Sequence, residues 1–112
     1  MPRKTQKYLE DILEACTDIN DFIAGKSEDD YLHDKMLRAA VERKLAVIGE
    51  ALSQAIRLDE TLAEYITEAP KIIGFRNRLI HGYGTIANDI VWQVLLNDLP
   101  VLNRNVTELL GK

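Results

Sequence analysis

Apolar residues in this chain recur at intervals of three and four, and this spacing restricts the fold more than any other feature. In the first helical segment they are Leu9, Ile12, Leu13, Cys16, Ile19 and Ile23. Such spacing gathers side chains on one face of an α-helix, whereas a half-buried strand alternates apolar and polar residues. No such alternation occurs, aromatic residues make up only 6%, and no hairpin dipeptide separates two apolar runs. The sequence therefore predicts an all-α protein.

Four helical segments account for most of the chain. The first is expected over residues 5–24, with Thr5 as its N-cap and Gly25 as its end. A second helix of about seven turns is expected to begin near Asp29 or Asp30. Its apolar stripe comprises Leu37, Ala40, Val41, Leu45, Ile48, Leu52, Ala55 and Ile56.

The second half of the chain adds two more helices. After a polar connection with a helical turn around residues 62–66, a third helix is expected over residues 70–81. A fourth begins after an Asn88 cap, and Pro100 is expected to kink or split it near Leu99. Short connections between long amphipathic helices favour an antiparallel bundle of four to five helices.

Length and cysteine content narrow the class further. A chain of 112 residues provides for one core, so we expect a single domain over residues 1–112. No apolar stretch approaches the roughly 18 residues of a membrane span. The first residues do not follow the pattern of a signal peptide, so we do not expect secretion. The single cysteine, Cys16, lies in the apolar stripe and is expected to pack rather than react. These features favour a cytoplasmic protein without a membrane association.

Charge is unevenly distributed. The formal net charge is −4, which argues against a protein that coats nucleic acid through bulk charge. Yet no acidic residue lies between Glu68 and Asp89, where Lys71, Arg76 and Arg78 contribute +3 and leave −7 for the rest of the chain. The window reflects either chance combined with the preference of cations for helix C-termini, or an anion-binding site.

The same window contains a cluster of chemically useful side chains. His81 can give and take a proton near neutral pH, and Arg76 and Arg78 can each hold a phosphate through two N–H groups. Asn77 lies four residues before His81, on the same helical face, where it can orient the imidazole. Tyr83 lies between two glycines. From these residues alone, His81 is equally well a capping group at a helix end.

Arg76 and His81 cannot form a compact site within one helix. Five residues separate them, which is about 140° around the axis and about 7.5 Å along it. Two protomers related by a two-fold axis would bring two such pairs together. No second histidine or cysteine lies at ligand spacing from His33 or His81, so neither a metal nor another cofactor is expected.

Gly49 and Glu50 lie in the middle of the second helix. A glycine there costs about 1 kcal/mol relative to alanine, which indicates close approach of a neighbouring helix. Glu50 is either a solvated carboxylate or a group that orients an arginine of that neighbour, for which Arg76 is the candidate.

Residues 76–83 resemble the Arg-x4-His-x-Tyr signature of HEPN-domain proteins, specifically the HepT-like toxins. Four further segments are similar to family landmarks in the same order: residues 8–15, 46–51, 90–92 and 97–100. The chain departs from many relatives at Lys71, where a tryptophan often follows the proline, and at Asn77, where aspartate is also common. The first departure bears on packing, and the second keeps a polar group.

The resemblance implies a homodimeric bundle with the motif at the dimer cleft. It implies a metal-independent endoribonuclease in which His81 is the general acid and base and Arg76 stabilises the transition state. Asn77 would be an orienting group. Arg78 and Lys71 are the cations expected to bind the RNA. The family toxin belongs to a type VII-like toxin–antitoxin pair, and a minimal nucleotidyltransferase antitoxin (MntA-like) silences it by adding AMP to the motif tyrosine, here Tyr83.

Two other functions are compatible with the same residues. One is a non-catalytic helical subunit that presents a substrate or nucleotide to a partner nucleotidyltransferase. The other is a helical interaction module in which the motif only caps a helix.

Overall fold

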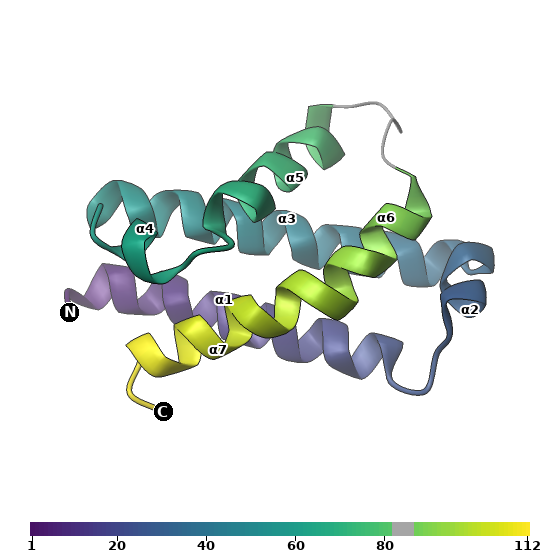
Figure 1. Ribbon diagram of the computed structural model, residues 1–112, viewed down its shortest axis with the longest axis horizontal. Coiled ribbons are helices and arrows are strands. Elements are labelled where there is room, and N and C mark those ends of the chain that lie inside the picture. The colour runs from purple at the N-terminus through teal and green to yellow at the C-terminus, as the bar shows by residue number, and fades with distance from the viewer. Residues whose placement is uncertain (82–86) are drawn as a thin grey trace.

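The long helices of this protein lie side by side in a flattened bundle (Figure 1). The structure is a computed structural model that describes residues 1–81 and 87–112, with side chains described for residues 1–80 and 87–112. Every regular element in these ranges is helical, which confirms the predicted all-α class. None of the helices in the described part of the chain is both long and apolar enough to span a membrane.

Helix α1 (Arg3–Ile23) begins two residues earlier than predicted. Thr5 is not its N-cap; Pro2 is, and the Gln6 amide donates to the Pro2 carbonyl at 3.0 Å. Thr5 lies inside the helix, fully buried. The helix ends as predicted, because Gly25 takes a positive φ of 73° that suits glycine.

The predicted long second helix is wrong in its first part. The chain forms a short helix α2 (Glu28–His33) and then a separate helix α3 (Lys35–Leu58), with a break at Asp34. Asp34 has extended backbone angles, and its carboxylate accepts from the Leu37 amide at 3.0 Å. This N-cap satisfies an otherwise unpaired amide of α3, so the two helices remain distinct.

Both ends of α2 are capped by side chains. Ser27 and Asp30 form a capping box: the Asp30 amide donates to Ser27 Oγ at 3.1 Å, and the Ser27 amide donates to Asp30 Oδ2 at 2.9 Å. At the other end, Arg38 Nη1 donates to the Tyr31 and Leu32 carbonyls at 3.2 and 2.6 Å. A cap at each end of α2 favours a separate short helix over one helix continuous with α3.

The last helical stretch is divided where Pro100 predicted. Helix α6 (Asn88–Gln93) continues into a π-helical turn, η1 (Val94–Asp98), and then into α7 (Leu99–Leu109). Proline lacks an amide hydrogen, and its ring would clash with the carbonyl four residues earlier, so the wider turn precedes it. Asn88 is the first helical residue rather than the cap, which is Ala87. The predicted turn after α3 is helix α4 (Leu62–Tyr65).

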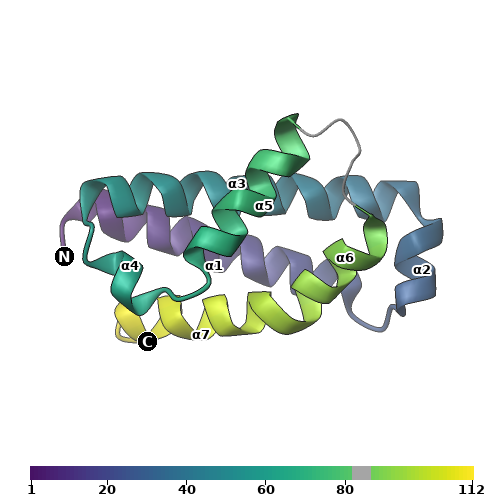
Figure 2. The ribbon, with the colours of Figure 1, turned by 45° about the horizontal axis from the view of Figure 1, so that its top comes forward.

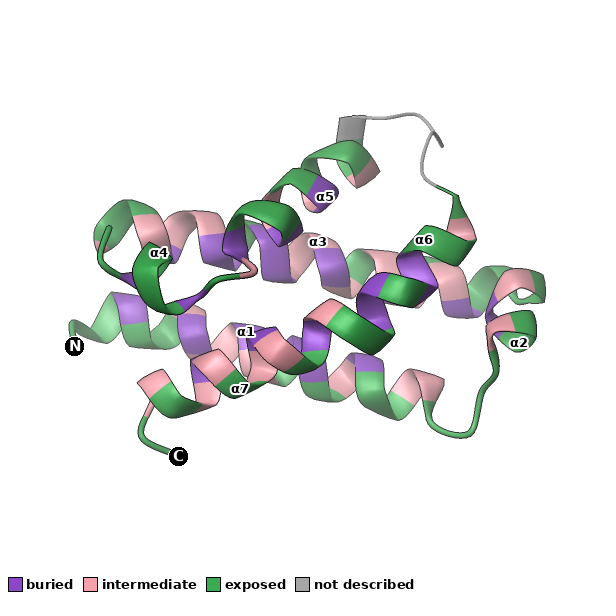
Figure 3. Ribbon diagram, in the orientation of Figure 1, coloured by how far each residue is buried: buried purple, intermediate pink, exposed green. Residues whose placement is uncertain are grey.

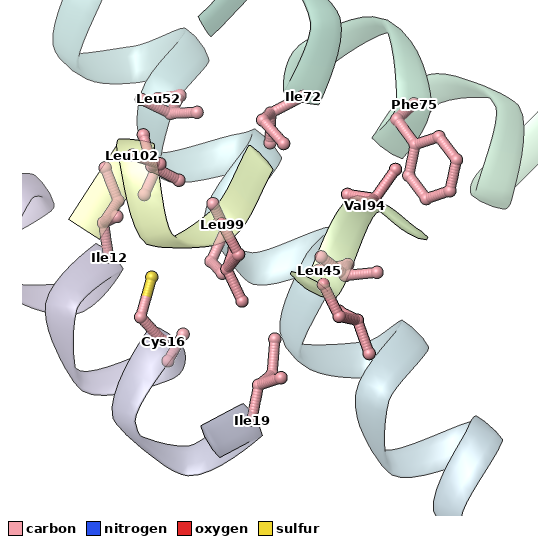
Figure 4. Close-up of a cluster of buried hydrophobic side chains, with 14 of the residues drawn as sticks. Ile12, Cys16, Ile19, Leu45, Leu52, Ile72, Phe75, Val94, Leu99 and Leu102 are labelled. Carbon is pink, nitrogen blue, oxygen red and sulfur yellow. The ribbon is translucent and has the colours of Figure 1, made fainter. Parts of the chain in front are cut away.

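The core lies where α1, α3, α7 and the start of α5 (Ala69–His81) meet. Figure 4 shows buried side chains from each of these helices and from η1: Ile12, Cys16, Ile19, Leu45, Leu52, Ile72, Phe75, Val94, Leu99 and Leu102. Burial raises the pKa of the Cys16 thiol to about 12, although a hydrogen bond with Asn103 acts in the opposite direction. Cys16 is therefore a packing residue, as its position in the stripe predicted.

Helix α5 packs on α3 at its start and rises away from the bundle toward its end (Figures 1 and 2). Ile72 and Phe75 are buried, whereas the following residues Asn77 and Arg78 are exposed. Figure 3 shows buried segments near the start of α5 and exposed segments toward its end. The start of the helix is also tied to η1, because Lys71 Nζ lies 3.0 Å from Asp98 Oδ2. This arrangement places the chemically useful end of α5 at the edge of the molecule.

Candidate functional site

The side chain of Arg76 is held by two neighbours on different helices. Its Nη2 lies 3.0 Å from Glu50 Oε2 on α3, and its Nη1 donates to Asn77 Oδ1 at 3.0 Å. Gln54 Nε2 in turn donates to Glu50 Oε1 at 3.0 Å, which fixes the carboxylate. Because Glu50 is about half exposed, this ion pair contributes at most about 1 kcal/mol to stability. Its main effect is to orient the guanidinium.

Gly49 lies directly beneath Arg76. A Cβ built on Gly49 would overlap the aliphatic stem of Arg76, with the Arg76 Cγ at 2.6 Å. No real Cβ tolerates that approach, so α3 and α5 can meet here only over a glycine. The close packing that Gly49 predicted is confirmed, and the residue it accommodates is Arg76.

Two of the five N–H donors of Arg76 are used by these contacts. The Nε donor is buried and has no partner within the described residues. An arginine that is anchored on one edge and has donors left over is suited to bind an anion such as phosphate.

A pocket of about 290 Å³ opens beside Arg76, between α1, α3 and α5. Its lining includes Tyr8, Arg43, Val47, Glu50, Arg76 and Ile80. A second pocket of about 430 Å³ lies between α1 and α7, and none of the motif residues lines it. The pocket beside Arg76 is therefore the candidate site.

The structure brings Arg76, Asn77 and Glu50 together but not the other two predicted cations. Arg78 is exposed, and no ion pair forms on it among the described residues. Lys71 is paired with Asp98, which raises the pKa of Lys71 through a hydrogen bond and its negative charge. Lys71 does not line the pocket. Its predicted contact with RNA would compete with Asp98.

His81 is the last residue of α5, five residues or about 7.5 Å beyond Arg76 along the axis. Its side chain lies outside the part of the chain that the structure describes, and so does the whole of Tyr83. The roles predicted for these two residues remain predictions. Among the described residues, no three His, Cys, Asp or Glu side chains gather in a way that could hold a metal ion.

Neither Tyr8 nor Arg43 was predicted as a site residue, and Arg43 is one of three closely spaced cations, together with Arg38 and Lys44. The structure separates the three: Arg38 caps α2, Lys44 pairs with Asp18 at 2.9 Å, and Arg43 lines the pocket. A signal existed for Arg43, because residues 43, 47 and 50 are spaced by four and three and share a helical face. For Tyr8 the signal was its place at the start of the segment 8–15 that is similar to a family landmark, whereas its place at the pocket depends on how α1 packs on α3.

Comparison with known proteins identifies relatives over almost the whole chain. Residues 12–109 match the family model described as HepT-like, Ribonuclease HepT-like. A protein of Caldanaerobacter subterraneus subsp. tengcongensis with a provisional RNase name is 35% identical over 107 residues, covering 94% of this chain and 93% of that protein. A similarly named protein of Methanocaldococcus jannaschii is 34% identical over 106 residues, covering 93% and 94%. A Thermococcus cleftensis protein provisionally named ribonuclease HepT is 33% identical over 104 residues, covering 91% and 92%. No solved structure matches the chain.

Proposed function

Because the chain belongs to the HepT-like ribonuclease family and is thereby an endoribonuclease, we propose that it cleaves unpaired RNA without a metal ion, using Arg76 and His81. RNA carries its own nucleophile, the 2′-hydroxyl. An enzyme therefore needs only to transfer protons and to stabilise charge on the phosphate. A histidine and an arginine provide these two functions.

The chemical step is a transesterification. His81 takes the proton of the 2′-hydroxyl, the 2′ oxygen forms a bond to phosphorus, and the bond from phosphorus to the 5′ oxygen breaks. The leaving 5′ oxygen receives a proton from an imidazolium. Arg76 donates hydrogen bonds to the non-bridging oxygens, on which negative charge grows. The products are a 2′,3′-cyclic phosphate and a 5′-hydroxyl.

The fixed position of Arg76 is the observation that carries this proposal. Glu50 and Asn77 orient the guanidinium before any substrate binds. A cation that is already oriented stabilises developing charge without a further reorganisation cost. It lies beside a pocket and on the helix that ends at His81.

Two copies of the chain would complete the site. Positions 76 and 81 lie about 140° apart around the helix axis, and one imidazole cannot at once accept and donate the two protons of the reaction. A two-fold dimer with α5 at its cleft would supply two histidines, one as base and one as acid. The exposed end of α5 is compatible with such a contact.

Cleavage of labelled RNA in the presence of EDTA tests the proposed function. We expect the purified protein to cut single-stranded RNA with EDTA present and to leave a 2′,3′-cyclic phosphate, detectable by mass spectrometry of the fragments. The same strand with 2′-deoxy residues is the matched control and should remain intact, because it lacks the nucleophile. Cleavage of the deoxy strand, or loss of all cleavage with EDTA, would contradict the mechanism.

We further propose that the protein is the toxin of a toxin–antitoxin pair and that a nucleotidyltransferase partner silences it. In that step the phenol oxygen of Tyr83 attacks the α-phosphorus of ATP and pyrophosphate leaves. The attached AMP carries a phosphate two residues from His81. It would compete with RNA for the cations of the motif.

Incubation with the partner nucleotidyltransferase and ATP tests this regulation. The wild-type chain should gain AMP and lose RNA cleavage, whereas Tyr83→Phe should gain none and remain active. Intact-mass and peptide mass spectrometry locate the modification. A gain of AMP on Tyr83→Phe would place the modified residue elsewhere. AMP on Tyr83 in a protein that never cleaves RNA would favour the non-catalytic subunit instead.

A further inference from the structure

The pocket beside Arg76 extends beyond the groups that the proposed mechanism uses. Its volume of about 290 Å³ lies between three helices, and Arg43 is among its lining residues. Arg43 precedes Glu50, the partner of Arg76, by seven residues on α3. That is two helical turns, or about 10 Å along the axis. One nucleotide with its neighbouring phosphates spans a distance of this order.

The charges of the pocket leave Arg43 as a candidate anion ligand. The two carboxylates that line the pocket already have partners: Glu50 pairs with Arg76 at 3.0 Å, and Asp11 pairs with Lys7 at 2.7 Å. Arg43 is exposed and forms no ion pair with any residue in the described ranges. Its guanidinium is therefore available to a phosphate that enters the pocket.

The lining between the two arginines is largely apolar. Ile80 is 46% exposed although it is a large apolar residue, and it lines this pocket together with Val47 and Ala46. The ring of Tyr8 is half-buried, packs against the core and also reaches the pocket. An aromatic ring beside an apolar surface is the usual partner of an unpaired nucleobase, which stacks on it.

We propose that this pocket binds one nucleotide of single-stranded RNA next to the phosphate held by Arg76. The base stacks on Tyr8, and the phosphate of the same nucleotide contacts Arg43. This inference rests on the proposed ribonuclease function for the identity of the ligand. Stacking and phosphate contacts do not read base edges, so the pocket accepts different bases. A paired base cannot leave its stack to enter the pocket, so the pocket favours unpaired RNA.

Binding of an uncleavable RNA tests the proposal separately from catalysis. The probe is a short fluorescein-labelled single strand whose 2′-hydroxyls are methylated, and the readout is fluorescence anisotropy at several salt concentrations. Tyr8→Leu should weaken binding roughly five- to hundredfold, because it removes one stacking ring. Arg43→Gln should reduce the slope of log K against log salt by roughly 0.7, the value for one phosphate contact on a single strand.

Two matched variants serve as controls. Tyr8→Phe keeps the ring and should bind like the wild type. Arg57→Gln removes the same charge from an exposed position on the same helix, outside the pocket, and should leave the Kd and its salt slope unchanged. Circular dichroism checks the fold of each variant. If Tyr8→Leu does not fold, the exposed position of Arg43 still allows the test.

The outcomes distinguish this inference from the proposed function. A wild type that binds the probe but cuts no unmodified RNA would contradict the function and leave the pocket as proposed. A wild type that cuts RNA, together with Arg43→Gln and Tyr8→Leu variants of unchanged KM and Kd, would overturn the pocket and leave the function. Absence of probe binding, or equal binding of the matching duplex, would also overturn the pocket.

Discussion

Alanine in place of Arg76 is expected to lower the kcat for RNA cleavage by roughly 10²–10³-fold. The guanidinium is held by Glu50 and Asn77. In the proposed mechanism its remaining N–H groups therefore stabilise charge on the phosphate without reorganisation. That charge grows in the transition state, and the loss should therefore appear in kcat more than in KM. Alanine in place of His81 is expected to lower kcat by roughly 10²–10⁴-fold, because a positioned proton donor and acceptor is lost.

Initial rates at saturating RNA with EDTA present measure both effects. Arg76→Lys is the matched variant: it keeps the charge but lacks the planar fork, so it should recover only a small part of the rate. Because the two residues act on one step, the double variant should be little slower than the slower single variant. A wild-type kcat in a folded Arg76→Ala protein would exclude Arg76 from the mechanism.

Glu50→Gln separates positioning from direct chemistry within the same experiment. Glutamine keeps the shape of Glu50 but not the charge that pairs with Arg76. We expect about a tenfold lower kcat when Arg76 is present and no further loss in the Arg76→Ala background. A loss that persists without Arg76 would mean that Glu50 acts on the substrate itself.

Gly49→Ala is expected to lower kcat about 10²-fold, although the change adds only a methyl group. The new Cβ would occupy the space of the Arg76 stem, so α5 or the arginine must move by about an ångström. Overpacking of this kind destabilises a fold by roughly 1–3 kcal/mol. The better helix propensity of alanine offsets about 1 kcal/mol of it. Thermal unfolding and the kcat for RNA cleavage measure the two effects.

Gly74→Ala provides the matched control one helix away. Apart from its chain neighbours and the backbone of its own helix, no described atom lies within 4 Å of a Cβ built on Gly74, which is exposed on α5. This variant should be stabilised by up to about 1 kcal/mol and keep the wild-type kcat. If both alanine variants behave alike, the contact between Gly49 and Arg76 does not determine the position of the arginine.

Helix positions could be predicted from this sequence far better than helix ends. Each long helix buries one whole face, and the free energy of that burial is large enough to leave a clear apolar stripe in a single sequence. Caps depend on smaller, local competition. Thr5 has the right chemistry for a cap, but Pro2 starts the helix earlier, and Asp34 caps α3 three residues before the apolar stripe begins at Leu37. Capping differences of about 1 kcal/mol decide such cases.

The parts of the candidate site that lie close together in the sequence could be predicted more readily than the contacts between helices. Arg76, Asn77 and His81 follow one another on a single helix, so their spacing alone suggested a shared role. The contact between Glu50 and Arg76 joins two helices, and only the glycine beside Glu50 hinted at it.

The rest of the pocket depends on how distant helices pack. Tyr8 is far from the motif in sequence, and it reaches the pocket only because α1 lies along α3. Such packing is set by the whole core and leaves no mark on the spacing of residues near Tyr8.

Helix α5 is packed against the bundle more firmly at its start than at its end. It has 13 residues, about 20 Å in length, and its buried residues lie in its first half, up to Phe75, where Lys71 also pairs with Asp98. If α5 tilted by only about 5° around its start, its far end would move by nearly 2 Å. Displacements of that size are enough to misalign reacting groups. The position of the far end of α5 therefore depends in part on residues outside the pocket, among them Ile72 and the π-turn that carries Asp98.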